Sequence, residues 1–181
     1  SSDLSSAALS FMVEEAFTEP VDAGMSVSRT YSLLTPVWNE EGQQFIYGHE
    51  EADSFTTGDF VLVTLTVEPQ GELRFVSVLE PLPAGFTVVE EDRSFRLAGI
   101  PRRYGEDYWG WNYWFDSREL SERSIDFYFT ELTEPVTFTY VLRAEHPGRF
   151  TALPAQARLL YERDITGRTA ADLLEVVPAG E

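Results

Sequence analysis

The run FVLVTLTV, from Phe60 to Val67, constrains the fold of this chain more than any other stretch. Successive side chains of an extended strand point to opposite faces, so a period of two sorts this run into two rows. One row holds Val61, Val63, Leu65 and Val67. No stretch of the chain keeps a 3.6-residue period over three helical turns, so the sequence predicts strands where it predicts regular structure.

Further strand-like runs recur along the chain, separated by Gly and Pro turn signals. Short strands at roughly ten-residue spacing are typical of antiparallel sandwiches. The sequence therefore predicts an all-β, antiparallel β-sandwich (immunoglobulin-like), forming a single domain over residues 1–181. Residues 117–123 are the one place where a short helix is expected, 36–57 are expected to be largely irregular, and 92–113 resemble a long surface insertion. The expected strands are 7–15, 25–35, 44–47, 60–67, 74–80, 86–91, 124–132, 136–143, 155–161 and 173–177.

Composition excludes several classes of protein. With 181 residues, 43% of them hydrophobic, the chain is long and apolar enough for a globular core. No apolar run approaches the ~18 residues of a membrane span. The 31 acidic and 13 basic residues give a formal net charge of −18, which argues against nucleic acid or anionic membranes as partners. We expect a monomer.

The residues available for chemistry predict no enzyme. There is no cysteine, and the two histidines, His49 and His146, are flanked by acidic and turn residues, which predicts surface loops. Carboxylate doublets on a strand point to opposite faces, so they are poor candidates for a catalytic pair. Glu50 to Asp53 is the least weak candidate for a metal site, and solvated surface charge explains this run better. We therefore expect no catalytic residue, no metal and no cofactor.

The densest aromatic cluster runs from Tyr104 to Phe115. Aromatic side chains dominate protein cores and interfaces alike. The cluster could therefore cap one end of the sandwich, contact a partner domain, or stack against sugars. Trp109, Trp111 and Trp114 are the candidates for such a partner surface.

The end of the chain carries a second candidate surface. After the turn at Pro147-Gly148, residues 155–161 alternate as a half-buried strand, but Leu160 places a large apolar side chain on the polar face. An outward apolar side chain beside Tyr161, where the strand gives out, suggests contact with something outside this domain.

An ordered set of short motifs resembles the C-terminal, macroglobulin-like (receptor-binding-like) domain of bacterial α2-macroglobulins. The resemblance spans nearly the whole chain, and the order of the motifs makes it more specific than any one of them. They are Val27-Ser28-Arg29-Thr30-Tyr31, Gly58-Asp59, Leu82-Pro83-Ala84-Gly85-Phe86, Glu122-Arg123 before Ile125–Phe129, Pro147-Gly148-Arg149-Phe150, Leu153-Pro154, Leu160-Tyr161 and Gly167-Arg168.

This resemblance implies a non-catalytic part of a periplasmic or envelope-anchored protease trap. In such a parent, proteases cut a bait segment, and a thioester in a separate domain then captures them. The C-terminal domain packs against that thioester domain, and one of its tyrosines shields the thioester until cleavage. The matching position is Tyr161, with Leu160 where methionine usually stands. The implied partners are thus the thioester domain of the same polypeptide and, through the parent, the target proteases.

Two observations leave alternatives open. Strict alternation turns Tyr161 toward the core with Leu159, as an ordinary aromatic at the core's edge, unless the strand ends or bulges there. Since the chain has no cysteine, the thioester lies elsewhere in the parent or does not exist. Some members of the family lack the thioester, and in such a parent Tyr161 would have nothing to shield. The alternative function is an adhesive or glycan-binding sandwich of a cell-surface protein, because the 82–86 motif also occurs in cell-surface repeat domains.

Overall fold

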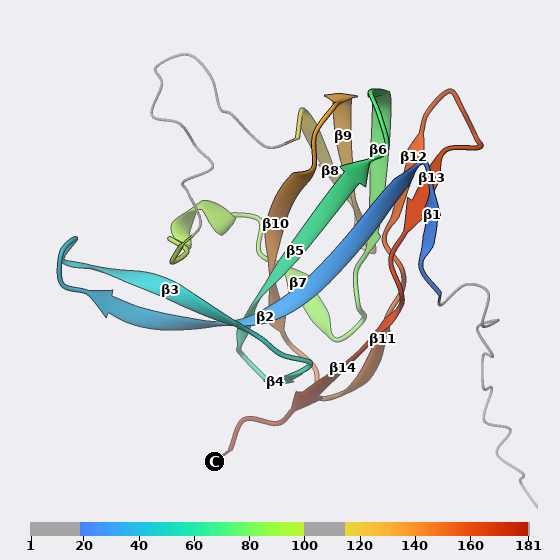
Figure 1. Cartoon of the computed structure of the whole chain (residues 1–181). Coiled ribbons are helices and arrows are strands. Elements are labelled where there is room, and N and C mark those ends of the chain that lie inside the picture. Colours follow the sequence, from blue (N-terminus) through green and yellow to red (C-terminus); the bar gives the residue numbers. More distant parts are fainter. Residues whose placement is uncertain (1–18, 100–114, 181) are drawn as a thin grey trace, which may run out of the picture.

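Two β-layers pack face to face, and a small third sheet lies at one end of them (Figure 1). The computed structural model describes residues 19–99 and 115–180. The strands in these stretches are β1 (Val21–Ala23), β2 (Met25–Asn39), β3 (Gln44–Glu51), β4 (Ser54–Thr56), β5 (Phe60–Pro69), β6 (Leu73–Pro81), β7 (Phe86–Val88), β8 (Ser117–Leu120), β9 (Ser124–Leu132), β10 (Val136–Ala144), β11 (Gly148–Ala152), β12 (Gln156–Leu159), β13 (Thr166–Arg168) and β14 (Asp172–Val177).

The predicted antiparallel sandwich is confirmed. One sheet has six strands in the order β1-β13-β12-β6-β9-β8, and the other has five in the order β3-β2-β5-β10-β7. Every pairing within these two sheets is antiparallel. The third sheet, β11-β14-β4, is mixed, because β14 runs parallel to β4. No helix long and apolar enough to cross a membrane occurs in the described stretches.

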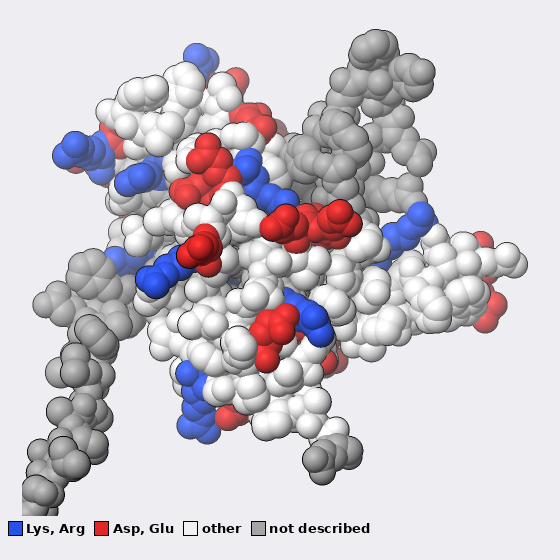
Figure 2. Space-filling model, turned by 180° about the vertical axis from the view of Figure 1, so that it is seen from behind, with Lys and Arg blue, Asp and Glu red and all other residues white. Residues whose placement is uncertain are grey.

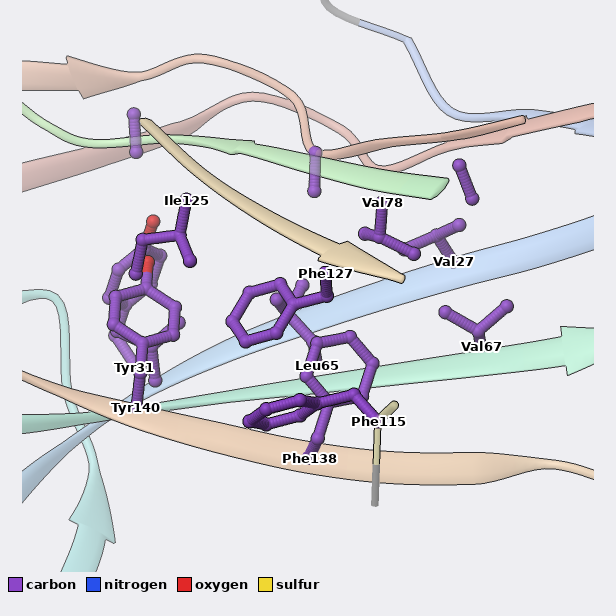
Figure 3. Close-up of a cluster of buried hydrophobic side chains, with 14 of the residues drawn as sticks. Val27, Tyr31, Leu65, Val67, Val78, Phe115, Ile125, Phe127, Phe138 and Tyr140 are labelled. Atoms are coloured by element: carbon purple, nitrogen blue, oxygen red, sulfur yellow. The ribbon is translucent and has the colours of Figure 1, made fainter. Parts of the chain in front are cut away.

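The alternating faces lie where the sequence predicts them. The row Val61, Val63, Leu65 and Val67 of β5 is 0% exposed and faces the six-stranded sheet. Aromatic rings fill the space between the two sheets: the Phe127 ring meets the Phe138 ring at a centroid distance of 4.6 Å and the Phe115 ring at 5.1 Å (Figure 3). Edge-to-face and tilted contacts of this kind add to the apolar burial. The core is thus the interface of the two sheets.

A second, smaller hydrophobic cluster covers the outer face of β5. Leu62 is 0% exposed and clusters with Leu34 and Val141. Phe95 and Leu97 pack over this cluster. They belong to the first part of the predicted insertion, where a 3-10 turn (η2, Asp92–Ser94) is followed by a backbone pairing with β3 at Tyr47. The remainder of the insertion lies outside the described residues.

Two local predictions are wrong. The expected helix at 117–123 is strand β8, paired antiparallel with β9 through a tight turn at Ser121. The stretch expected to be irregular contains the hairpin of β2 and β3, which forms an arm at the left of Figure 1. Pro36 lies inside that arm, which is possible because β2 has only the edge strand β3 beside it there. In both places strand pairing overrides local propensity.

Candidate functional site

Leu160 and Tyr161 lie just beyond the end of β12, in a loop that projects at the upper right of Figure 1. Ala157 and Leu159 are buried as the alternation predicts, but Tyr161 is 80% exposed and Leu160 is 48% exposed. The inward position that strict alternation predicts for Tyr161 is therefore wrong, because the strand ends two residues earlier. The two neighbouring apolar side chains both face solvent.

Phe75 of β6 completes this surface and is not among the site residues predicted from the sequence. Its ring meets the Tyr161 ring edge-on, with 5.4 Å between centroids and an interplanar angle of 88°. Its carbonyl oxygen accepts a hydrogen bond of 3.0 Å from the backbone N–H of Leu160. The signal in the sequence was the adjacent pair Phe75-Val76, which breaks the alternation of β6. We call Phe75, Leu160 and Tyr161 the apolar loop surface.

A second cluster, largely buried, centres on Arg29 of β2. The side chains of Arg29 and Glu80 are both 0% exposed and lie 3.1 Å apart, N to O. Arg29 also donates 2.7 Å to Asp172 of β14 and 2.8 Å to the carbonyl oxygen of Leu153. The Tyr140 hydroxyl donates 2.7 Å to Glu80. One guanidinium thus joins residues of all three sheets.

Burial governs the ionisation of this cluster. Desolvation raises the pKa of the Glu80 carboxyl, and the charge of Arg29 and the hydroxyl of Tyr140 offset part of that rise. Burial alone would lower the pKa of Arg29, but Glu80, Tyr31 and Asp172 outweigh it and raise that pKa. Since each nitrogen of the guanidinium already donates to a protein oxygen, the arrangement holds the sheets together and has no donor left to bind an anion.

Tyr31 gives this cluster a measurable pH dependence. It is 4% exposed, and its hydroxyl has no hydrogen-bond partner among the described residues. Burial first, and then the charge of Glu80, raise its pKa well above the ordinary value of 10.0. Above pH 10 the folded chain keeps this proton and the unfolded chain loses it, so the free energy of unfolding falls as pH rises.

We expect Tyr31→Phe to stabilise the chain by about 1 kcal/mol at pH 7, because it removes an unsatisfied buried hydroxyl. Above pH 10 the free energy of unfolding of the variant should fall less steeply than that of the unchanged chain, by ~1.4 kcal/mol per pH unit. Urea unfolding followed between pH 7 and 11.5 measures both effects. If the free energies of unfolding of Tyr31→Phe and of the unchanged chain fall equally steeply above pH 10, the raised pKa of Tyr31 is contradicted. Tyr140→Phe is the matched comparison, and it should destabilise at pH 7 because Glu80 loses a donor.

Several motifs that carry the family resemblance make close packing contacts within the sandwich. A Cβ at Gly167 would lie 2.6 Å from the carbonyl oxygen of Met25, so the crossing of β13 over β2 requires glycine. A Cβ at Gly85 would lie 2.1 Å from the Phe150 ring, so the 82–86 and 147–150 motifs pack on each other. These positions hold the sandwich together. By contrast, Leu160 and Tyr161 are adjacent large apolar residues that are both exposed.

The remaining candidates are the two histidines, the carboxylates of residues 50–53 and three tryptophans. His146 lies in an exposed bend, whereas His49 is exposed on strand β3 and not in the predicted loop. A cavity of about 630 Å³ opens beside Arg29, with Glu51 and Asp53 on its wall. Within 19–99 and 115–180 no group of three His, Asp or Glu residues could hold a metal. Trp109, Trp111 and Trp114, the candidates for a partner surface, lie outside the described residues. The face of the molecule shown in Figure 2 has acidic and basic side chains interspersed over its surface.

Residues 24–164 match the family model described as Bacterial Alpha-2-macroglobulin MG10 domain. No curated protein sequence matches the chain.

Solved structures of bacterial α2-macroglobulins share the fold. The Salmonella protein reacted with methylamine has a TM-score of 0.64 at 22% identity, over 88% of this chain and 10% of that one. The native Escherichia coli protein, from domain MG7 to its C-terminus, has a TM-score of 0.64 at 22% identity, over 88% of this chain and 24% of that one. The E. coli protein activated by porcine elastase has a TM-score of 0.67 at 21% identity, over 88% of this chain and 14% of that one. The chain spans at most about a quarter of these relatives.

Proposed function

This chain belongs to the MG10 domain family of bacterial α2-macroglobulins, and we propose that it is the non-catalytic domain that shields the thioester of a protease-trapping parent. In this proposal the apolar loop surface packs against the thioester domain of the same polypeptide until a protease cuts the bait segment. The parent is periplasmic or anchored in the cell envelope.

One observation carries the proposal: Tyr161 and Leu160, the pair that the family resemblance selects, are exposed together at the end of a strand. A sandwich that has already buried its core gains nothing by exposing a phenol ring and a leucine side by side. Contact sites are commonly built from exposed apolar side chains that lie together, and in this pair the family resemblance selects the same two residues. A phenol is suited to covering a hydrolysable bond, because its ring excludes water while its hydroxyl keeps one hydrogen bond.

The chemistry of the relatives fits this assignment. Structures have been solved of the Salmonella relative reacted with methylamine and of E. coli relatives activated by trypsin or by elastase. An amine attacks a thioester carbonyl, forms an amide and releases the thiol. A cover that keeps small amines and water from this bond before proteolysis would preserve it for the trapped protease.

Protection of the Tyr161 side chain from oxidation in the parent protein tests the proposal. In this chain the Tyr161 ring is 80% exposed, so hydroxyl-radical oxidation followed by mass spectrometry should modify it readily in the isolated chain. We expect strong protection of Tyr161 in the native parent and its loss after bait cleavage, with a free peptide standard reporting the radical dose. Equal oxidation of Tyr161 in the isolated chain and in both parent states would contradict the proposed contact.

A further inference from the structure

The backbone at Phe75 has a conformation that bulky residues rarely adopt. Its φ is +58°, in the left-handed region that favours glycine or asparagine. The register between β6 and β9 pairs Arg74 with Glu131 and Val76 with Phe129, but the ladder omits Phe75 between them. A phenylalanine at such a position persists only if the surrounding structure holds it there.

The unusual backbone places the ring of Phe75 outside the core. Val76 and Val78 on the same strand are 0% exposed, whereas Phe75 is 45% exposed. No gain in core burial therefore offsets the strained conformation. Instead, the Phe75 ring makes the edge-on contact with the Tyr161 ring.

Phe75 holds the loop at two points. Its carbonyl oxygen accepts the Leu160 N–H, which ties the loop backbone to β6 where β12 ends. Its ring supports the Tyr161 ring, which projects from the loop with most of its surface in solvent. Without the second contact, a side chain that is 80% exposed would sample several rotamers.

We propose that Phe75 is a positioning residue that presents the Tyr161 ring to the thioester domain in one orientation. This inference rests on the proposed function, because the oriented ring has a role only if a neighbouring domain receives it. Fixing a contact side chain before docking reduces the conformational entropy lost on binding, which strengthens the closed state without a new contact. The exposed pair Trp38–Phe45 on the β2–β3 arm, with centroids 5.1 Å apart, is a matched control because it has similar ring geometry elsewhere.

The experiment measures methylamine incorporation by the full-length parent before proteolysis. The variants are Phe75→Gly, Tyr161→Gly, the double variant, Phe75→Tyr and the control Phe45→Ala. We expect Phe75→Gly to accelerate incorporation roughly 2- to 10-fold, the range that loss of an aromatic pair predicts. The double variant should react no faster than Tyr161→Gly, because Phe75 acts through Tyr161. Phe75→Tyr keeps an aromatic ring at this position and should accelerate incorporation less than Phe75→Gly, whereas Phe45→Ala should keep the rate of the unchanged parent.

Hydrogen exchange of β6 and β9 in the same preparations separates positioning from stability. Glycine adopts a φ of +58° without strain, so the protection of both strands should not fall in Phe75→Gly. A loss of protection there, together with faster incorporation, would assign Phe75 to the stability of the sheet and overturn the inference.

The rates of methylamine incorporation also distinguish a failure of the positioning role of Phe75 from a failure of the proposed function. If Tyr161→Gly accelerates incorporation and Phe75→Gly does not, the positioning role is wrong and the proposed function stands. If the two single effects multiply in the double variant, Phe75 acts independently of Tyr161, and the inference is overturned. If neither variant changes the rate, or the parent incorporates no methylamine even when methylamine is present during bait cleavage, the proposed function itself is wrong.

Discussion

Replacing Arg29 with methionine should cost the chain about 3–5 kcal/mol of its free energy of unfolding. The variant leaves the Glu80 carboxyl fully buried without its cation, and it removes the donor to two backbone carbonyls. A loss of that size is a large fraction of the 5–15 kcal/mol, roughly, that holds a domain folded. Urea unfolding followed by circular dichroism measures the loss, and a value below about 1 kcal/mol would contradict this account of the cluster.

Two controls show which property of Arg29 matters. Arg74 pairs with Glu72 on the surface, both side chains more than half exposed, and Arg74→Ala should change stability by less than about 0.5 kcal/mol because water solvates both charges. Arg29→Lys keeps the charge but not the planar fork that bonds several oxygens at once, so it should remain strongly destabilising. Combining Arg29→Met with Glu80→Leu should recover part of the loss, since no buried carboxylate is then left unpaired.

The faces of the central strands could be predicted from the sequence because their period is two. Side-chain direction along a strand follows from chain geometry alone, so the buried row of β5 and the row Ile125, Phe127 and Phe129 of β9 were fixed by their spacing. The pairing partner of a strand is not fixed by its own residues. The segment Ser117–Leu120 has weak local preference, and β9 beside it makes it a strand.

The site was only half predictable. The outward direction of Leu160 follows from its place in the alternating pattern, and exposure confirms it. The direction of Tyr161 depends on where β12 ends, and that end is set by the pairing of β12 with β6 and β13. A positive φ at Phe75 has no signature in the sequence, where phenylalanine argues for ordinary strand geometry. Likewise, Arg29 sits in an alternating run, and nothing local shows that two carboxylates meet it.

Loss of the Tyr161 ring should have the largest effect on the parent protein. Burying an aromatic side chain of this size stabilises a contact by about 1.5–3 kcal/mol. If methylamine reaches the thioester only when the cover opens, Tyr161→Gly should raise the population of the open state, and hence the reaction rate, roughly 10- to 100-fold. Tyr161→Phe keeps the ring and loses one hydroxyl, so its rate should stay within a few fold of the unchanged parent.

The rate of methylamine incorporation by the uncleaved Tyr161→Gly parent, relative to the unchanged parent, tests most directly whether this domain covers the thioester. The account predicts a rate at least about tenfold higher, with the ability to trap an added protease lost as the reactive bond is consumed. A rate equal to that of the unchanged parent, in a preparation that still incorporates methylamine, would contradict it.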